Sequence, residues 1–169
     1  MKAKLSPLIL IDFAILNSNF TFIPPMADEN VPEIVSLYDI DVNFALFPEP
    51  DLIRVLVKAA INSNQEKKSG YSMFAEGVAI FQFSKDAVLT DEEKKNLQQY
   101  STVSLALNSL RGFISSLTAS APFGRYILPS IDVSDLFKQK AKLAQELKEQ
   151  TKKTPKKKPH KSISNSTGK

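Results

Sequence analysis

Hydrophobic and polar residues alternate along four stretches in the first half of the chain, a pattern typical of half-buried β-strands. The stretches are residues 8–23, the segment around 40–46, residues 53–61 and residues 71–83. Short or moderate connections join them, among them the polar "NSNQEKKSG" between the third and fourth stretch. Consecutive strands with such connections predict an antiparallel sheet.

The first stretch changes phase along its length. Phe13 and Ile15 alternate in one phase and Phe20 and Phe22 in the other, so we expect a bulge or bend around residues 16–19. Pro24 and Pro25 then end the strand, because proline cannot donate to a strand ladder. We expect a loop from Met26 to Glu33 before the second strand.

The pattern turns helical after "LTDEEKKNL". Thr90 and Glu93 have the spacing of a capping box. Apolar residues three or four apart follow it, and they predict a helix of seven or eight turns with one buried stripe: Leu97, Tyr100, Val103, Leu107, Leu110, Ile114 and Leu117.

The other face of this helix is nearly free of charge, since Arg111 is the one charged residue between Lys95 and Arg125. Exposed helix faces normally carry Lys, Glu and Arg, whereas interface cores are depleted of charge. We therefore favour a subunit interface over an exposed polar face. The residues assigned to this interface are Val103, Ser104, Leu107, Ser109, Gly112 and Phe113.

A second, shorter helix closes the folded part. The stretch "RYILP" is extended, and Asp132 or Ser134 can cap the helix that follows. The fold class expected is thus α+β, with a four-stranded antiparallel sheet, a long helix and a C-terminal helix in one domain over residues 1–150. Residues 151–169 lack an apolar period and contain two prolines, which predicts a disordered lysine-rich tail.

Composition adds limits to this picture. The chain has 169 residues and no cysteine, so disulfides and thiolate metal sites are excluded. The start "MKAKLSPLILIDFAIL" imitates a secretory signal, but Asp12 interrupts it and no segment has the length of a membrane helix. We expect a cytoplasmic protein with no membrane insertion.

The net charge of +4 comes from the tail, where seven lysines and no acid follow from Lys152 onward. Such a cluster supports weak, nonspecific nucleic-acid contact through phosphates, and it has no aromatic residue to stack on bases.

Residues for catalysis are scarce. The single histidine, His160, lies in the tail, and the five glycines form no phosphate-binding loop. Asp39, Asp41 and Glu76 are either a general-acid or hard-metal group or, as we favour, part of a solvated sheet face. We expect no enzyme, no cofactor and no metal. The fourth strand is apolar on both faces, so binding is the better interpretation.

The order of these parts, together with "YILPSIDVSDLF" and the strand ending "VAIFQF", resembles the SecB family of protein-export chaperones. The resemblance implies an ATP-independent holdase for unfolded polypeptides, assembled as a homotetramer from two dimers. It also implies a loop that crosses over between the first two strands. The client-binding residues implied are Phe22, Met26, Val31, Ile34, Tyr126, Leu128, Leu136 and Phe137.

The family docks the translocation motor SecA through acidic positions on its outer sheet face, where this chain has Asn17 and Thr21. Asp39, Asp41 and Glu76 on the same sheet are the alternative docking acids. Three interpretations follow. The first is a general holdase in protein export, and the second is a SecB-like chaperone dedicated to one client, such as an antitoxin. The third is a non-enzymatic scaffold with a nucleic-acid-binding tail.

Overall fold

The computed structural model describes residues 2–153, so the predicted tail lies outside the described residues from position 154 onward. The chain divides into two compact units, Met1–Val133 and Ser134–Lys169. The first contains the sheet and the long helix, and the second contains most of the C-terminal helix.

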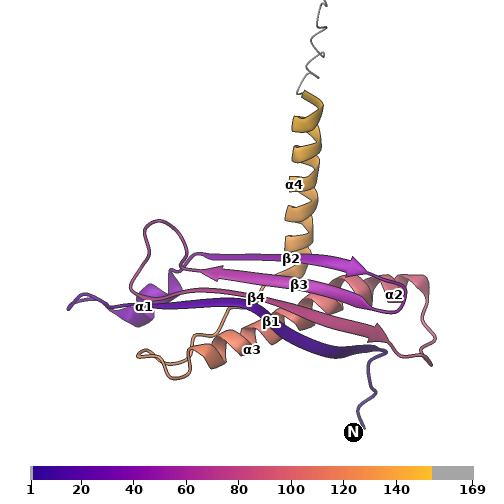
Figure 1. The fold of residues 1–169 in the computed structure, drawn as a ribbon, viewed down its shortest axis with the longest axis horizontal. Helices are drawn as coiled ribbons and strands as arrows, with labels where there is room; N and C mark the ends of the chain where they lie inside the picture. Colours follow the sequence, from indigo (N-terminus) through magenta and orange to yellow (C-terminus); the bar gives the residue numbers. More distant parts are fainter. Residues whose placement is uncertain (1, 154–169) are drawn as a thin grey trace, which may run out of the picture. The chain divides into compact units, whose positions relative to one another are not determined.

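Four antiparallel strands form the sheet in the order β1-β4-β3-β2 (Figure 1). The strands are β1 (Leu8–Ile23), β2 (Ile40–Pro48), β3 (Ile53–Ile61) and β4 (Gly70–Phe83). Because β1 and β2 lie at opposite edges, the chain crosses the end of the sheet between them, as the resemblance implied. This crossover segment (residues 24–39) contains a short helix, α1 (Val31–Ser36), where the sequence had predicted only a loop up to Glu33.

Two irregularities interrupt the pairing of β1 with β4. The register shifts between Leu10 and Asp12 and again between Ile15 and Asn17. Ile11 and Leu16 are therefore the extra residues of two β-bulges, and the second confirms the predicted change of phase. The bulges keep the phenylalanines of both halves of β1 on the same side of the sheet.

A 27-residue helix covers that side of the sheet. It runs through α2 (Asp91–Asn96), a π-helical turn η1 (Leu97–Ser101) and α3 (Thr102–Leu117). The predicted capping box is present, because the Glu93 N–H donates to Thr90 Oγ1 at 3.2 Å and the Thr90 N–H donates to the Glu93 carboxylate at 2.8 Å.

The core lies between α3 and the two central strands, β3 and β4. Val103, Ala106, Leu110 and Ile114 of α3 are fully buried. They face the alternate positions of the sheet, of which Val55, Ala59, Ala79 and Phe81 are also inaccessible. Val103 and Leu107, which the sequence analysis placed at a subunit interface, are thus buried against the sheet of their own subunit.

The C-terminal helix, α4 (Val133–Lys153), begins one residue after Asp132, the first of the two predicted caps. Leu136 and Phe137 lie in its first two turns. None of the helices in the described part is long and apolar enough to span a membrane.

Candidate functional site

A group of aromatic side chains joins β1 and β4 to the crossover segment and to the post-helix segment (residues 118–132). The aromatic cluster consists of Phe20, Phe22, Tyr38, Tyr71, Phe123 and Tyr126. Ring centroids lie 5.5 Å apart for Phe20 and Tyr71, and 5.6 Å apart for Phe22 and Phe123. Tyr38 stacks on Tyr126 at 6.0 Å. Pairs at these distances stabilise a cluster beyond the area they bury.

Two tyrosine hydroxyls fix the surrounding backbone. The Tyr71 hydroxyl donates to the Gly124 carbonyl at 2.9 Å and accepts from the Phe123 N–H at 2.8 Å. The Tyr38 hydroxyl donates to the Ser69 carbonyl and accepts from the Tyr71 N–H, both at 2.7 Å. The crossover and post-helix segments are therefore both tied to the start of β4.

Gly70 permits this close approach. Its φ is +105°, and a Cβ added there would lie 2.1 Å from the Tyr38 hydroxyl. A larger residue would displace the Tyr38 hydroxyl from its hydrogen bonds with Ser69 and Tyr71.

Titration of the tyrosines in the aromatic cluster makes the free energy of unfolding depend on pH. Burial raises the pKa of Tyr126 to about 12, with a smaller contribution from Tyr38, and burial also raises the pKa values of Tyr38 and Tyr71. The folded state thus favours the neutral phenol of Tyr126. This group's contribution to folding stability is fully present below its pKa in the unfolded chain, near 10, and is lost as the pH rises through its folded pKa of about 12.

We expect the difference in unfolding free energy between wild type and Tyr126→Phe to change by roughly 2 kcal/mol between pH 9 and pH 12. The wild type should lose more stability than the variant, as measured by urea unfolding at each pH. The variant removes the titrating group but keeps the ring. Parallel pH profiles for the two proteins would contradict the assignment.

Four exposed hydrophobic side chains lie on the segments that the aromatic cluster joins, and we call them the apolar rim: Met26, Leu37, Phe123 and Ile127. Their exposed fractions are 77%, 65%, 40% and 67%, respectively. Leu37 and Ile127 are chain neighbours of the stacked rings Tyr38 and Tyr126. The hydrogen bonds of the Tyr38 and Tyr71 hydroxyls thus hold the backbone segments that carry these side chains.

The expected client-binding residues divide by exposure. Met26 is exposed, Phe22 and Ile34 are half-buried, and Val31, Tyr126 and Leu128 are buried in the core. Leu136 and Phe137 belong to the second unit. The sequence analysis did not select Leu37, Phe123 or Ile127, although the alternation in Tyr126, Ile127 and Leu128 would have placed Ile127 outward.

The crossover segment carries negative charge beside the rim. Asp28, Glu29 and Glu33 lie there, and the sequence contains no lysine or arginine between Lys4 and Arg54. The Glu29 carboxylate accepts from the Ser69 hydroxyl at 2.5 Å and from the Met26 N–H at 2.9 Å, and these hydrogen bonds lower its pKa. This contact links the turn after β1 to the start of β4.

The three carboxylates considered for chemistry lie apart. Asp39 precedes β2, and its carboxylate accepts from the Ser63 N–H at 3.1 Å. Asp41 pairs with Ala60, and Glu76 pairs with Lys58 two rows away along the sheet. Among the described residues no three acidic or histidine side chains are grouped to hold a metal ion.

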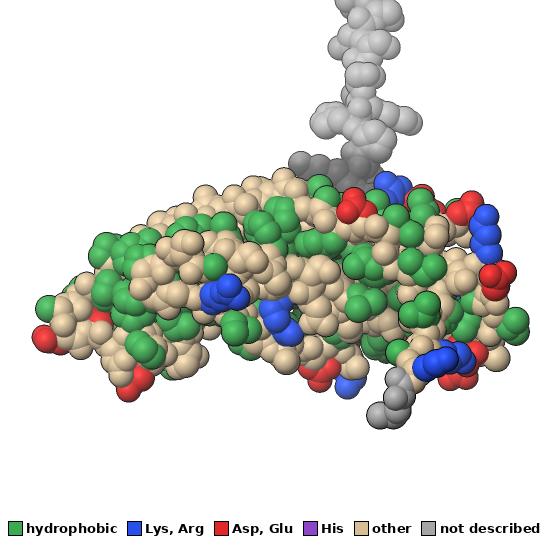
Figure 2. Space-filling view, turned by 90° about the horizontal axis from the view of Figure 1, so that it is seen from below, with side chains coloured by type: hydrophobic (Ala, Val, Ile, Leu, Met, Phe, Trp, Pro, Cys, Tyr) green, Lys and Arg blue, Asp and Glu red, His purple; other side chains and the backbone are tan. Residues whose placement is uncertain are grey.

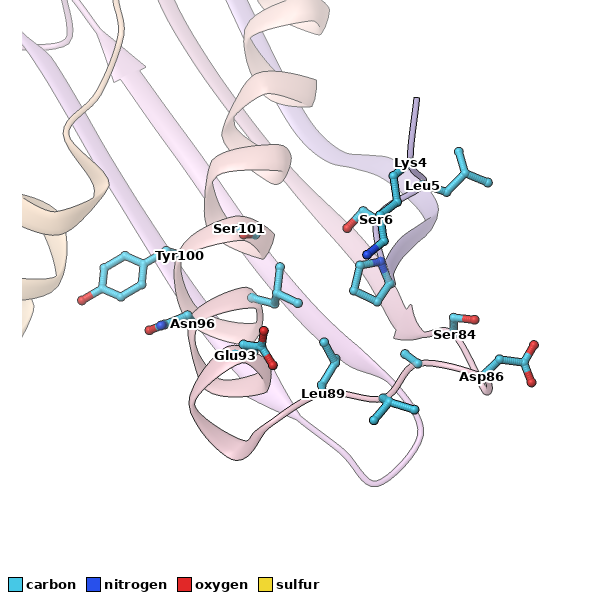
Figure 3. A pocket seen from close by; sticks show the side chains of 14 residues that line it. Lys4, Leu5, Ser6, Ser84, Asp86, Leu89, Glu93, Asn96, Tyr100 and Ser101 are labelled. Atoms are coloured by element: carbon cyan, nitrogen blue, oxygen red, sulfur yellow. The ribbon is translucent and has the colours of Figure 1, made fainter. Parts of the chain in front are cut away.

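A hollow of about 820 Å³ lies at the other end of β1 (Figure 3). Residues 4–7 line one side, residues 84–89 a second, and the helix from Glu93 to Ser101 a third. Figure 2 shows hydrophobic side chains along one face of the first unit, with few charged side chains across its centre.

No protein-family model matches the sequence, and no curated protein matches it at a significant level. Among solved structures, the Mycobacterium tuberculosis Rv1957 SecB-like chaperone, in complex with a ChAD peptide from the Rv1956 HigA1 antitoxin, has a similar fold. Its TM-score is 0.50 with 15% identity, covering 74% of this chain and 91% of the other. A protein of unknown function from Streptococcus agalactiae has a TM-score of 0.40 and 9% identity, and the match covers 73% of this chain and 97% of that one.

Proposed function

We propose that this protein is an ATP-independent chaperone that binds non-native polypeptides and keeps them from aggregating. The observation that carries the proposal is the apolar rim, four exposed hydrophobic side chains on segments that tyrosine hydrogen bonds tie to the start of β4. Apolar burial contributes about 25 cal/mol per Å² and is non-directional, so such a surface accepts many sequences. The SecB-like fold supports the proposal.

The chaperone acts as a homotetramer in this proposal, with two faces of each subunit covered by other copies. One is the outer edge of β1, where Ile9, Ile11 and Leu16 are 39%, 50% and 56% exposed. The other is the outward face of α3, centred on Leu105, Asn108, Gly112 and Ser116. Ser104, Ser109 and Phe113, which the sequence analysis selected, flank this line and are half-buried.

A chaperone dedicated to one client is the second candidate. Asn17 and Thr21 share the outer sheet face with Glu76 and Ser72, their partners on β4, so the two first-strand positions where the resemblance implies acids for docking SecA are uncharged. The structural neighbour bound to an antitoxin peptide supports the same candidate. We propose that the clients are unfolded polypeptides, with an antitoxin-like segment as the dedicated case.

An aggregation assay tests the proposal. A chemically unfolded, slow-folding protein is diluted into buffer without nucleotide, and light scattering is followed at rising amounts of this protein. Suppression at a near-stoichiometric ratio is expected, because each subunit offers one rim. Deleting Lys152 to Lys169 should leave suppression unchanged, whereas loss of activity on deletion would favour the scaffold with a binding tail.

A well-folded tetramer that fails to suppress aggregation of any test protein would contradict a general holdase. Co-purification would then be used to look for a single client.

A further inference from the structure

The middle of α4 is exposed to solvent. All nine residues from Lys138 to Glu146 are exposed, among them Leu143 at 58%. Leu136 and Phe137, nearer the start of the helix, are half-buried. Helices in proteins gain most of their stability by packing an apolar face, so a surface that covers the exposed stretch would stabilise α4.

The apolar residues of α4 recur at the period of an α-helix. They form one stripe along its sequence: Val133, Leu136, Phe137, Leu143, Ala144 and Leu147. Lys140 interrupts the stripe, whereas Lys138 and Lys142 lie outside it. A helix with a narrow apolar stripe and a lysine-rich polar face is typical of segments that lie on a membrane surface.

Charge separates the two compact units of the chain. Residues 134–169 carry eleven lysines against three acids, a net charge of +8. Residues 1–133 carry eleven basic and fifteen acidic residues, a net charge of −4. Four of the eleven lysines lie at positions 138, 140, 142 and 148, and seven follow from Lys152 onward. The second unit therefore attracts anionic surfaces that the first unit repels.

The apolar stripe and the lysines together favour a lipid surface among anionic partners. Nucleic acid would neutralise the lysines but leave the stripe uncovered, and a second copy of the helix would bring like charges together. An anionic bilayer takes up both features, because the stripe enters the boundary between headgroups and acyl chains while the lysines meet lipid phosphates. The described part of α4 is not apolar enough to cross a bilayer, so it would lie in the interface.

We propose that α4 and the lysine-rich segment after it bind the surface of an anionic membrane. Leu143 turns toward the acyl chains, and Lys138 and Lys142 stay at the level of the headgroups. The negative charge of residues 1–133 confines the attachment to residues 134–169. This inference goes beyond the proposed function and does not depend on chaperone activity.

Co-sedimentation of the full chain with vesicles tests the proposal. The probe is a vesicle of equal parts phosphatidylcholine and phosphatidylglycerol, and phosphatidylcholine alone is the neutral control. Binding to the anionic vesicles should be at least about tenfold stronger, and it should fall when salt is raised from about 0.1 M to about 1 M. Equal binding to both vesicles, or binding to neither, overturns the proposal.

Two variants of α4 separate apolar insertion from attraction by charge alone. Leu143→Glu and Gln145→Glu add the same charge at exposed positions of one helix, but only the first removes an apolar side chain. Gln145→Glu should weaken vesicle binding by no more than about fivefold. Leu143→Glu should weaken it by at least about fiftyfold, because leucine burial is lost as well. Equal losses would overturn the seating of α4 in the interface.

Separate readouts keep membrane binding apart from chaperone activity. Aggregation suppression without vesicles should be equal for wild type and Leu143→Glu, since Leu143 lies outside the apolar rim. Vesicle binding without suppression would uphold the membrane proposal and overturn the chaperone. Fluorescence anisotropy with a labelled RNA oligonucleotide covers the other anionic partner: RNA binding by a chain that does not bind anionic vesicles would assign the lysines to nucleic acid and overturn the membrane proposal.

Discussion

Replacing Met26 and Ile127 together by serine should weaken suppression of aggregation at least about tenfold, because these are the two most exposed side chains of the rim. Each loses roughly 1 kcal/mol or more of apolar burial against a bound client. Neither side chain supports the fold, since both are largely in solvent in the free protein. The loss would be measured as the protein ratio needed for half-maximal suppression.

The matched control places the same change elsewhere. Phe47 and Leu52, 46% and 36% exposed, are also large hydrophobic residues at the surface, but they lie at the β2–β3 turn, away from the aromatic cluster. Phe47→Ser with Leu52→Ser should keep wild-type suppression. If both double variants lost activity equally, binding would depend on general surface hydrophobicity and the rim would have no special role.

Local patterns predicted the elements whose signals lie within a few residues. Alternation gave β1 its observed bounds, Leu8 to Ile23, and the change of phase located the bulge at Leu16. Thr90 and Glu93 marked the helix start because a capping box is complete within four residues. The α+β class and the antiparallel sheet follow from such signals alone.

Contacts between residues far apart in the chain could not be predicted from the sequence. Tyr71 bonds to Gly124 and Phe123, more than fifty positions away, and Tyr38 meets Ser69 and Tyr71. No spacing rule predicts these partners, so Tyr126 and Leu128 were expected at a binding surface although both are buried. α1 was missed because a six-residue helix with a proline in its first turn has no period to detect.

Gly112 sits where a solvent-exposed helix would favour another residue. Glycine in a helix interior is about 1 kcal/mol less favourable than alanine. A Cβ added at Gly112 would have no atom within 4 Å, so nothing in its own subunit requires glycine there. In the proposed tetramer the reason lies in a second helix, since small residues allow two helices to approach closely.

Gly112→Arg should therefore split the tetramer into dimers, which light scattering would report as half the mass, because a long charged side chain would be buried without a partner. The β1 pairing should survive in these dimers. Gly112→Ala is the control for folding: in the isolated subunit it should raise stability by about 1 kcal/mol. An arginine variant with unchanged mass would show that the outward face of α3 is solvent-exposed and that the assembly uses another surface.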